Sequence, residues 1–240
     1  MNYHWDWGVL FRSPFFGWIL SGFALTCLIS LLAWILALLI GSVVGVGRTL
    51  DNRAVRALGT LYVEVFRSIP LLVQFFLWYY VLPQVLPTAW GTFLKRGLPN
   101  AQFWTVVVGL GLYTAARVAE QVRSGIGAIP RGQSSAALAV GFTRLQMYRY
   151  VLLPVAYRML VPSLTSEFLG VFKNSSLALT LGVLELTAQT RQIEDYTFQA
   201  FEAFTAATVL YALVSFIVMG LMRMIEGRSR IVGTMAVGAA

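Results

Sequence analysis

The chain has 240 residues, of which 58% are hydrophobic and only 12% are charged, and its mean hydropathy is +0.73. An ordinary soluble domain carries about 25% charged residues, so this composition excludes a soluble globular protein and indicates an all-α integral membrane protein. The net charge is +8, but the basic residues are spread along the chain rather than gathered in one patch. A nucleic-acid partner is therefore not expected.

Long uncharged stretches divide the chain into candidate membrane spans. Residues 13–47 contain no Asp, Glu, Lys or Arg over 35 positions, and residues 68–94 contain none over 27. Two further uncharged stretches have 20 residues each, and an apolar stretch before Glu185 is interrupted only by Glu167 and Lys173. Because about 20 helical residues cross the hydrocarbon core of a bilayer, the sequence predicts five transmembrane helices. The predicted spans are 17–46, 60–86, 99–122, 159–184 and 202–224.

The first predicted span contains two glycines, Gly41 and Gly45, that lie four residues apart. This spacing places them on one face of a helix. Small residues at such positions let a second helix approach closely within a membrane, so we expect this face to be a packing surface.

The distribution of basic residues predicts the orientation of the spans. With the amino terminus outside, the inner segments hold 12 arginines and the outer segments hold four basic residues. Inner loops of membrane proteins are enriched in Lys and Arg. We therefore expect the amino terminus outside and the carboxyl terminus in the cytoplasm. The outer basic residues are Arg12, Lys95, Arg96 and Arg191.

The longest inner segment, residues 123–158, is longer than a connection between two helices requires, and long loops often carry a function. Pro130 and its neighbours would end a helix that continued from the third span. Ser134 or Ser135 is expected to cap a short helix of small residues. Gly141 follows this helix at the position where a left-handed carboxyl cap is expected.

A second short helix is predicted after this glycine. Thr143 and Gln146 have the spacing of a capping box, and we expect the helix to end before Pro154. Two short helices that meet at a glycine form either an amphipathic element on the membrane surface or a docking surface for another protein.

This loop is similar to the cytoplasmic EAA loop of the permeases in binding-protein-dependent ABC importers. The family pattern is Glu-Ala-Ala, then a Gly four residues after the second Ala, and later a hydrophobic residue followed by Pro. Ser135 stands where the family usually has Glu, and serine can itself cap a helix, so the helix is expected to form. The matching residues here are Ser135, Ala136, Ala137, Gly141, Leu153 and Pro154.

Other stretches resemble the polar amino acid subfamily of these permeases, and the similarity runs from about residue 18 to residue 223. The subfamily resemblance is carried by residues 66–75, 149–154 and 172–177. Within the subfamily, the chain resembles the permeases of glutamate/aspartate importers most. That resemblance is carried by residues 60–64, 115–118, 121–123 and 173–175.

The resemblance implies a type I ABC importer permease fold in a bacterial inner membrane. Its implied partners are an ABC ATPase dimer, a second related permease or a second copy of this chain, a periplasmic substrate-binding protein and an acidic amino acid. ATP and Mg would bind to the partner ATPase, and this chain is expected to bind no cofactor. The loop residues implied to contact the ATPase are Ser135, Ala136, Ala137, Leu138, Gly141, Phe142, Leu153 and Pro154.

The absence of certain motifs from the chain agrees with ATP binding by a separate ATPase subunit. Its only lysines, Lys95 and Lys173, do not belong to a Gly-x-x-x-x-Gly-Lys-Ser/Thr phosphate-binding loop. His4 is the single histidine and Cys27 the single cysteine, which leaves little material for a His/Cys metal site or a His-assisted nucleophile. An enzymatic role is therefore not expected.

Polar residues within the second span are candidates for a substrate path. Glu64 and Arg67 lie three residues apart, and we expect them to form a structural ion pair on one helix face. Pro70 is expected to bend the helix. Gln74 either lines the path or forms an ordinary interhelical hydrogen bond.

The fourth span is more informative. Glu167, Gly170 and Asn174 fall on one helical stripe, whereas Lys173 lies about 120° from Glu167 around the axis. These two charged residues are therefore not expected to pair. Residues 173–176 have low helix propensity, and transporters bind substrate where a helix is interrupted near mid-membrane.

Lys173 either pairs with a residue of another helix, faces an anionic substrate, or extends to the outer membrane surface as a snorkelling side chain. Related permeases for cationic or neutral amino acids often have Asp at the position of Asn174. The loss of that negative charge beside a retained lysine favours an anionic substrate. The candidate path residues are Arg67, Pro70, Gln74, Glu167, Lys173, Asn174 and Ser175.

Three alternative functions remain open from the sequence. One is a stand-alone secondary transporter or channel that uses Glu167 and Lys173 as an ion relay, although five spans without an internal repeat argue against it. Another is a non-transporting membrane scaffold with residues 123–158 as its docking site. The third is an importer permease for a different polar amino acid.

Overall fold

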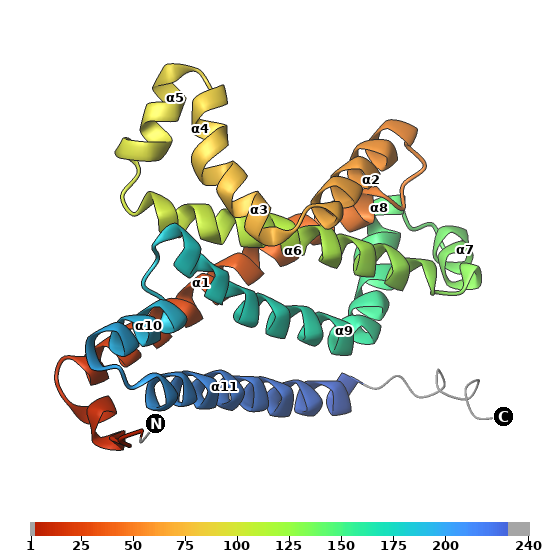
Figure 1. Ribbon diagram of the computed structural model, residues 1–240. Helices are drawn as coiled ribbons and strands as arrows, with labels where there is room; N and C mark the ends of the chain where they lie inside the picture. Colours follow the sequence, from red (N-terminus) through yellow and green to blue (C-terminus); the bar gives the residue numbers. More distant parts are fainter. Residues whose placement is uncertain (1–2, 230–240) are drawn as a thin grey trace.

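The structure is a computed structural model that describes residues 3–229. These residues form helices joined by short turns, and no strand occurs among them (Figure 1). The α-helices are α1 (Phe15–Gly47), α2 (Arg53–Ser68), α3 (Leu71–Phe76), α4 (Leu82–Val85), α5 (Thr88–Thr92), α6 (Ala101–Gly127), α7 (Arg131–Ala139), α8 (Arg144–Met147), α9 (Leu153–Asn174), α10 (Leu186–Thr197) and α11 (Ala200–Ser229). Trp7–Phe11 and Ser175–Leu181 are 3₁₀-helices, and Leu77–Val81, Phe93–Gly97 and Tyr148–Leu152 are π-helical turns.

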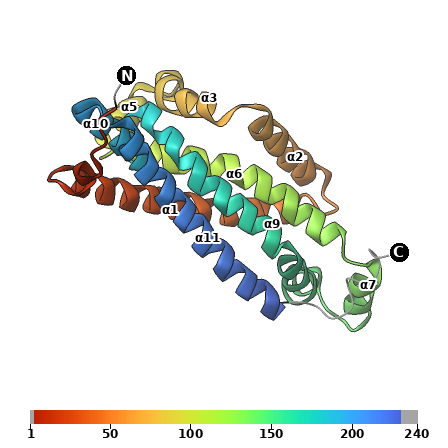
Figure 2. The same ribbon diagram turned by 60° about the horizontal axis from the view of Figure 1, so that its bottom comes forward.

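The helix α6 is the centre of the bundle. It packs against α1, α2 and α9, while α11 packs against α9 and α10 at the opposite side (Figure 2). Buried apolar side chains of α1, α3, α6 and α9 form one core cluster, which contains Ile29, Phe75, Leu110 and Val171. A second cluster joins the carboxyl-terminal part of α6 and the amino-terminal part of α9 to the short helices α7 and α8.

The two glycines of α1 make the contact with α6 very close, as the sequence predicts. A Cβ atom at Gly41 would lie 2.7 Å from Cβ of Val118 and 2.8 Å from the carbonyl oxygen of Ala115. A Cβ atom at Gly45 would lie 2.7 Å from Cβ of Val122. Side chains at these two positions would therefore push the helices apart.

The second predicted span is broken. Pro70 lacks a backbone N–H, and Ile69 before it adopts an extended conformation, with φ −100° and ψ 126°. Helix α2 therefore ends at Ser68, and the chain continues through α3 to α4 after a bend of 105°. In Figure 1, α4 and α5 stand away from α6 as a hairpin, with α2 on the other side of α3.

Length and composition identify between two and four candidate spans within residues 3–229. The helices Phe15–Gly47 and Ala200–Met224 qualify alone, and two bent pairs qualify together: Arg53–Ser68 with Leu71–Val85, and Arg144–Leu181 with Leu186–Thr197. Helix α6 coincides with the third predicted span but carries charged residues along its inner half, and it does not qualify. The count of five spans stays a prediction.

Replacement of Gly41 with Val is expected to destabilise the protein, because the new side chain would collide with Val118 and with the backbone of α6. Overpacking of this kind costs about 1–3 kcal/mol. The expected result is a lower melting temperature of the purified protein. Gly17 lies on the same helix with no atom within 4 Å of an added Cβ, so Gly17→Val is the matched control. Equal melting temperatures for the two variants would contradict the close α1–α6 contact.

Candidate functional site

A polar cavity of about 290 Å³ lies between the end of α2, the carboxyl-terminal half of α6 and the middle of α9. Within residues 3–229 it combines charged side chains from three helices that are distant in sequence. Such residues are costly at membrane depth and usually face a cavity or a partner. Its lining residues are Arg67, Tyr113, Arg117, Glu120, Gln121 and Glu167.

Glu167 is held in this cavity by two side chains of α6. The Nε atom of Arg117 lies 2.9 Å from Oε2 of Glu167, and Nε2 of Gln121 donates to Oε1 of Glu167 at 3.0 Å. Arg117 and Gln121 are four residues apart, so they lie on the same face of α6. This face therefore fixes the carboxylate of α9.

Glu120 lines the same cavity and is paired with two further arginines. Its Oε2 atom lies 2.6 Å from Nη1 of Arg48, just after α1, and its Oε1 atom lies 2.5 Å from Nη2 of Arg123. The side chain of Arg48 is only 8% exposed. This partly buried ion pair ties the carboxyl-terminal end of α1 to α6.

The predicted ion pair between Glu64 and Arg67 is wrong. The two side chains are exposed and form no ion pair with each other. Arg67 is in the last turn of α2, next to the break before Pro70, and there it lines the cavity with residues of α6. No carboxylate among residues 3–229 forms an ion pair with it.

Gln74 is not exposed to a path in this structure, and it does not bond to a distant helix either. Its side chain is buried, and Nε2 donates to the carbonyl oxygens of Phe66 and Ile69 at 2.9 Å each. These carbonyls belong to the broken end of α2, where no helical N–H follows to bind them. Gln74 therefore stabilises the bend that Pro70 creates.

The predicted interruption of the fourth span is confirmed. Helix α9 ends at Asn174, and the chain continues as a 3₁₀-helix from Ser175. Ser175 is fully buried, and its Oγ donates to the carbonyl oxygen of Phe172 at 2.7 Å. Asn174 is half-buried.

Lys173 and Glu167 face different cavities, as their angular separation predicts. Lys173 is exposed, and it lines a second cavity of about 300 Å³ between α9, α10 and α11. Four hydroxyl groups share this cavity with the lysine. An ion relay through Glu167 and Lys173 has no support from this placement. The other lining residues are Ser176, Thr187, Phe204, Ala207, Thr208 and Tyr211.

Glu185 is a polar centre that the sequence analysis did not identify. Its fully buried carboxylate accepts hydrogen bonds from the backbone N–H groups of Thr187 and Ala188 at 3.0 and 2.9 Å. The hydroxyl groups of Tyr211 and Thr26 also donate to it, at 3.0 and 3.3 Å. This residue caps α10 and joins it to α1 and α11. Its position before a polar helix is the available signal, since side-chain acceptors at this position cap helices.

The segment between α6 and α9 contains the two predicted short helices, with corrected bounds. Helix α7 begins at Arg131, directly after Pro130, so neither Ser134 nor Ser135 caps it. Ser134 instead donates to the carbonyl oxygen of Arg131. Proline before the first turn supplies the extended conformation that starts a helix, which explains the earlier start.

The capping box of the second helix is confirmed: Thr143 Oγ1 accepts from the N–H of Gln146, and the Gln146 side chain accepts from the N–H of Thr143. The prediction that this helix ends before Pro154 is wrong. The chain stays helical from Arg144 through the π-turn Tyr148–Leu152 into α9, and Pro154 is the second residue after that turn. The π-turn already interrupts the regular hydrogen-bond ladder, so the missing N–H of Pro154 does not end the helix.

Gly141 adopts the predicted left-handed conformation, with φ 89°. The residues on both sides of this glycine form a surface with exposed apolar side chains, including Leu138, Phe142 and Leu145. Ala137 is buried against the inner end of α6, while Ser135 and Ala136 are exposed. Leu153 is half-buried and Pro154 exposed at the start of α9.

The loop between α1 and α2 contacts α8 and the π-turn that follows it. Arg144 forms an ion pair with Asp51, and the Tyr148 hydroxyl lies 3.0 Å from Oγ1 of Thr49. These contacts link residues 144–148 to the end of α1.

Comparison with known proteins identifies the family of the chain. Residues 37–231 match the family described as the binding-protein-dependent transport system inner membrane component. The chain belongs to this family. It is 49% identical to the glutamate/aspartate import permease protein GltJ of Escherichia coli (strain K12), over 98% of this chain and 99% of the relative. It is 30% identical to the glutamine transport system permease protein GlnP of the same strain, over 94% and 98%.

Comparison with solved structures supports the same family. A crystal structure of an amino acid ABC transporter with histidines matches with a TM-score of 0.80 and 27% identity, over 94% of this chain and 100% of the other. The MetNI methionine ABC transporter in an inward-facing conformation matches with a TM-score of 0.74 over 92% of this chain and 100% of the other. At 21% identity, that second match supports the fold alone.

The chain is therefore a multi-pass inner-membrane permease subunit of an ATP-driven amino acid importer. A separate ATPase subunit hydrolyses ATP, so the chain is not an enzyme and binds no cofactor of its own. An importer of this family also requires a substrate-binding partner. The hypotheses of a stand-alone secondary transporter and of a membrane scaffold are thereby excluded.

Proposed function

We propose that this permease forms the translocation path for an acidic amino acid, glutamate or aspartate, and that the cavity between α2, α6 and α9 is part of this path. The observation that carries the proposal is the unpaired Arg67 in that cavity, beside carboxylates that already have arginine partners. The 49% identity to a glutamate/aspartate import permease supports the same substrate class.

The charge balance of the cavity favours an anion. Glu167 is neutralised by Arg117, and Glu120 is bound by both Arg48 and Arg123. Arg67 adds a further positive charge. Arg67 is exposed, so its guanidinium is accessible to a substrate, and a guanidinium binds a carboxylate with two parallel hydrogen bonds. A substrate carboxylate would therefore provide the ion-pair partner that Arg67 lacks.

Lys173 and Asn174 supply a second argument on the same helix. The lysine lines a hydroxyl-rich cavity, and no carboxylate among residues 3–229 forms an ion pair with it. Asn174, at the end of α9, adds no negative charge beside it. In this proposal Lys173 adds a second positive charge that attracts the anion, in a cavity separate from that of Arg67.

The loop of α7 and α8 is the proposed contact with the ATPase dimer. Its exposed apolar side chains Leu138, Phe142 and Leu145 suit a groove on another protein, and its links to α1 and α9 would carry the motion into the membrane. The loop then lies in the cytoplasm, the amino terminus lies in the periplasm, and five helices cross the bilayer. A second related permease, or a second copy, completes the path, and a periplasmic binding protein delivers the substrate.

Substitution of Arg67 tests the substrate proposal. Charge-assisted hydrogen bonds contribute about 1.5–3 kcal/mol, so Arg67→Met is expected to lower aspartate uptake about 10- to 100-fold in proteoliposomes that contain the assembled importer and its binding protein. Arg56→Met is the control, since Arg56 is exposed on the same helix and does not line the cavity. Unchanged aspartate uptake by Arg67→Met would contradict a role for this cavity, and preferred uptake of uncharged asparagine by the wild type would contradict the substrate class.

A second prediction concerns Lys173 and Asn174. Lys173→Met is expected to reduce aspartate uptake while complex assembly stays intact, because the anion loses its attraction. Asn174→Asp is also expected to reduce uptake, because the substrate would meet a like charge. A snorkelling lysine predicts a different result, in which both variants transport normally. Uptake of labelled aspartate, normalised to assembled complex, separates the two outcomes.

A third prediction concerns Gly141. A β-branched side chain is strained at φ 89°, by about 1–2 kcal/mol or more, so Gly141→Val is expected to reorient α7 against α8. The expected result is normal insertion with weaker ATPase binding and slower uptake. Gly127→Val is the control, because Gly127 lies in the helical conformation with open space around it. Normal uptake with the ATPase bound to Gly141→Val would show that this loop is not the coupling element.

A further inference from the structure

The hairpin between α4 and α6 carries two basic side chains without partners. Lys95 and Arg96 are adjacent in the π-turn Phe93–Gly97, and neither forms an ion pair with any residue between 3 and 229. The sequence contains no Asp or Glu between Glu64 and Glu120. The positive charge of this hairpin is therefore uncompensated over a long stretch of chain.

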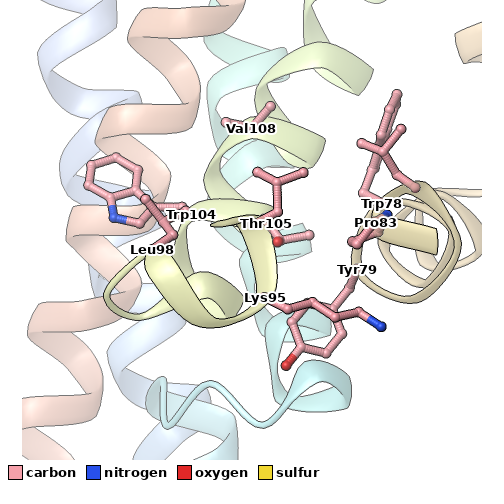
Figure 3. A pocket seen from close by; sticks show the side chains of 10 residues that line it. Trp78, Tyr79, Pro83, Lys95, Leu98, Trp104, Thr105 and Val108 are labelled. Atoms are coloured by element: carbon pink, nitrogen blue, oxygen red, sulfur yellow. The ribbon is translucent and has the colours of Figure 1, made fainter. Parts of the chain in front are cut away.

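An apolar slot of about 140 Å³ opens beside Lys95. Figure 3 shows its walls: Tyr79 and Pro83 on one side, Thr105 and Val108 of α6 on the other, and Lys95 reaching from its turn towards Tyr79. The hydroxyl group of Thr105 already donates to the carbonyl oxygen of Ala101 at 2.8 Å. The slot thus offers an almost wholly apolar surface with a single ammonium group.

A polar hollow of about 360 Å³ adjoins this slot and shares Lys95 and Pro83 with it. The hollow lies between α4 and α5, and it adds the guanidinium of Arg96 and the side chains of Thr88 and Thr92. Two cations and two hydroxyl groups therefore surround the polar end of a site whose other end is apolar. A ligand that fits both parts has an anionic head and a hydrocarbon chain.

We propose that the α4–α5 hairpin binds an anionic phospholipid, with the phosphate at Lys95 and Arg96 and part of an acyl chain in the apolar slot. The protein lies in a bilayer, so lipid is present at this surface. Trp90, which is 64% exposed, and Phe93 flank the cations on the same hairpin, as aromatic side chains do at the level of lipid headgroups.

The test is native mass spectrometry of the assembled importer with added phosphatidylglycerol or phosphatidylcholine of identical acyl chains. We expect the importer to retain phosphatidylglycerol more strongly. Each basic residue near an anionic lipid contributes about fivefold in affinity. The affinity of the double variant K95Q/R96Q for phosphatidylglycerol is therefore expected to fall about 25-fold. Arg191→Gln removes an exposed cation on α10 and is expected to change nothing.

A second variant tests the apolar half independently of charge. Val108→Trp would fill the slot from α6 and is expected to lower retention of phosphatidylglycerol with Lys95 and Arg96 intact. Equal retention of the two lipids by the wild type, or wild-type retention by K95Q/R96Q, would overturn the proposal. Displacement of the lipid by inorganic phosphate alone would identify a site for a free anion instead. Loss of binding-protein affinity in K95Q/R96Q, with lipid retention unchanged, would assign the cations to a protein partner.

Discussion

The close contact between α1 and α6 is the constraint on which the other features depend. Because Gly41 and Gly45 carry no side chain, the backbone of α1 lies against Val118 and Val122 of α6. This contact fixes α6 in the centre of the bundle and fixes its rotation about its own axis. The polar edge of the same helix must then face α2 and α9, and the end of α1 is close enough for a partly buried ion pair.

Charge pairing at membrane depth determines what this polar edge can do. A carboxylate in such surroundings requires a partner, and Glu120 and Glu167 each have at least one arginine. Arg67 lines the same cavity without a carboxylate. The protein therefore places a surplus cation beside a break in α2 that Pro70 creates, where backbone irregularity and a cavity coincide. That combination suits an anionic amino acid, and it requires no catalytic group.

Local features of the fold could be predicted from the sequence, because they depend on neighbouring residues only. The left-handed Gly141 and the capping box of Thr143 are set by backbone sterics and by spacing. Two local predictions are nevertheless wrong: neither Ser134 nor Ser135 caps α7, and the second short helix does not end before Pro154. Other errors concern contacts between helices. Arg67 was expected to pair along its own helix, and Gln74 was not expected to bond to the broken end of α2, because these contacts depend on how α2 ends. Glu185 was missed because its hydroxyl partners come from α1 and α11.

The central claim is that the surplus charge of Arg67 binds the substrate carboxylate. The most direct measurement is a density map of the assembled importer with an inactive ATPase and saturating aspartate. The account predicts substrate density in the cavity between α2, α6 and α9, with one carboxylate at ion-pair distance from Arg67 and the Arg117–Glu167 pair retained. Substrate density elsewhere, with Arg67 paired to a carboxylate of the protein, would contradict it.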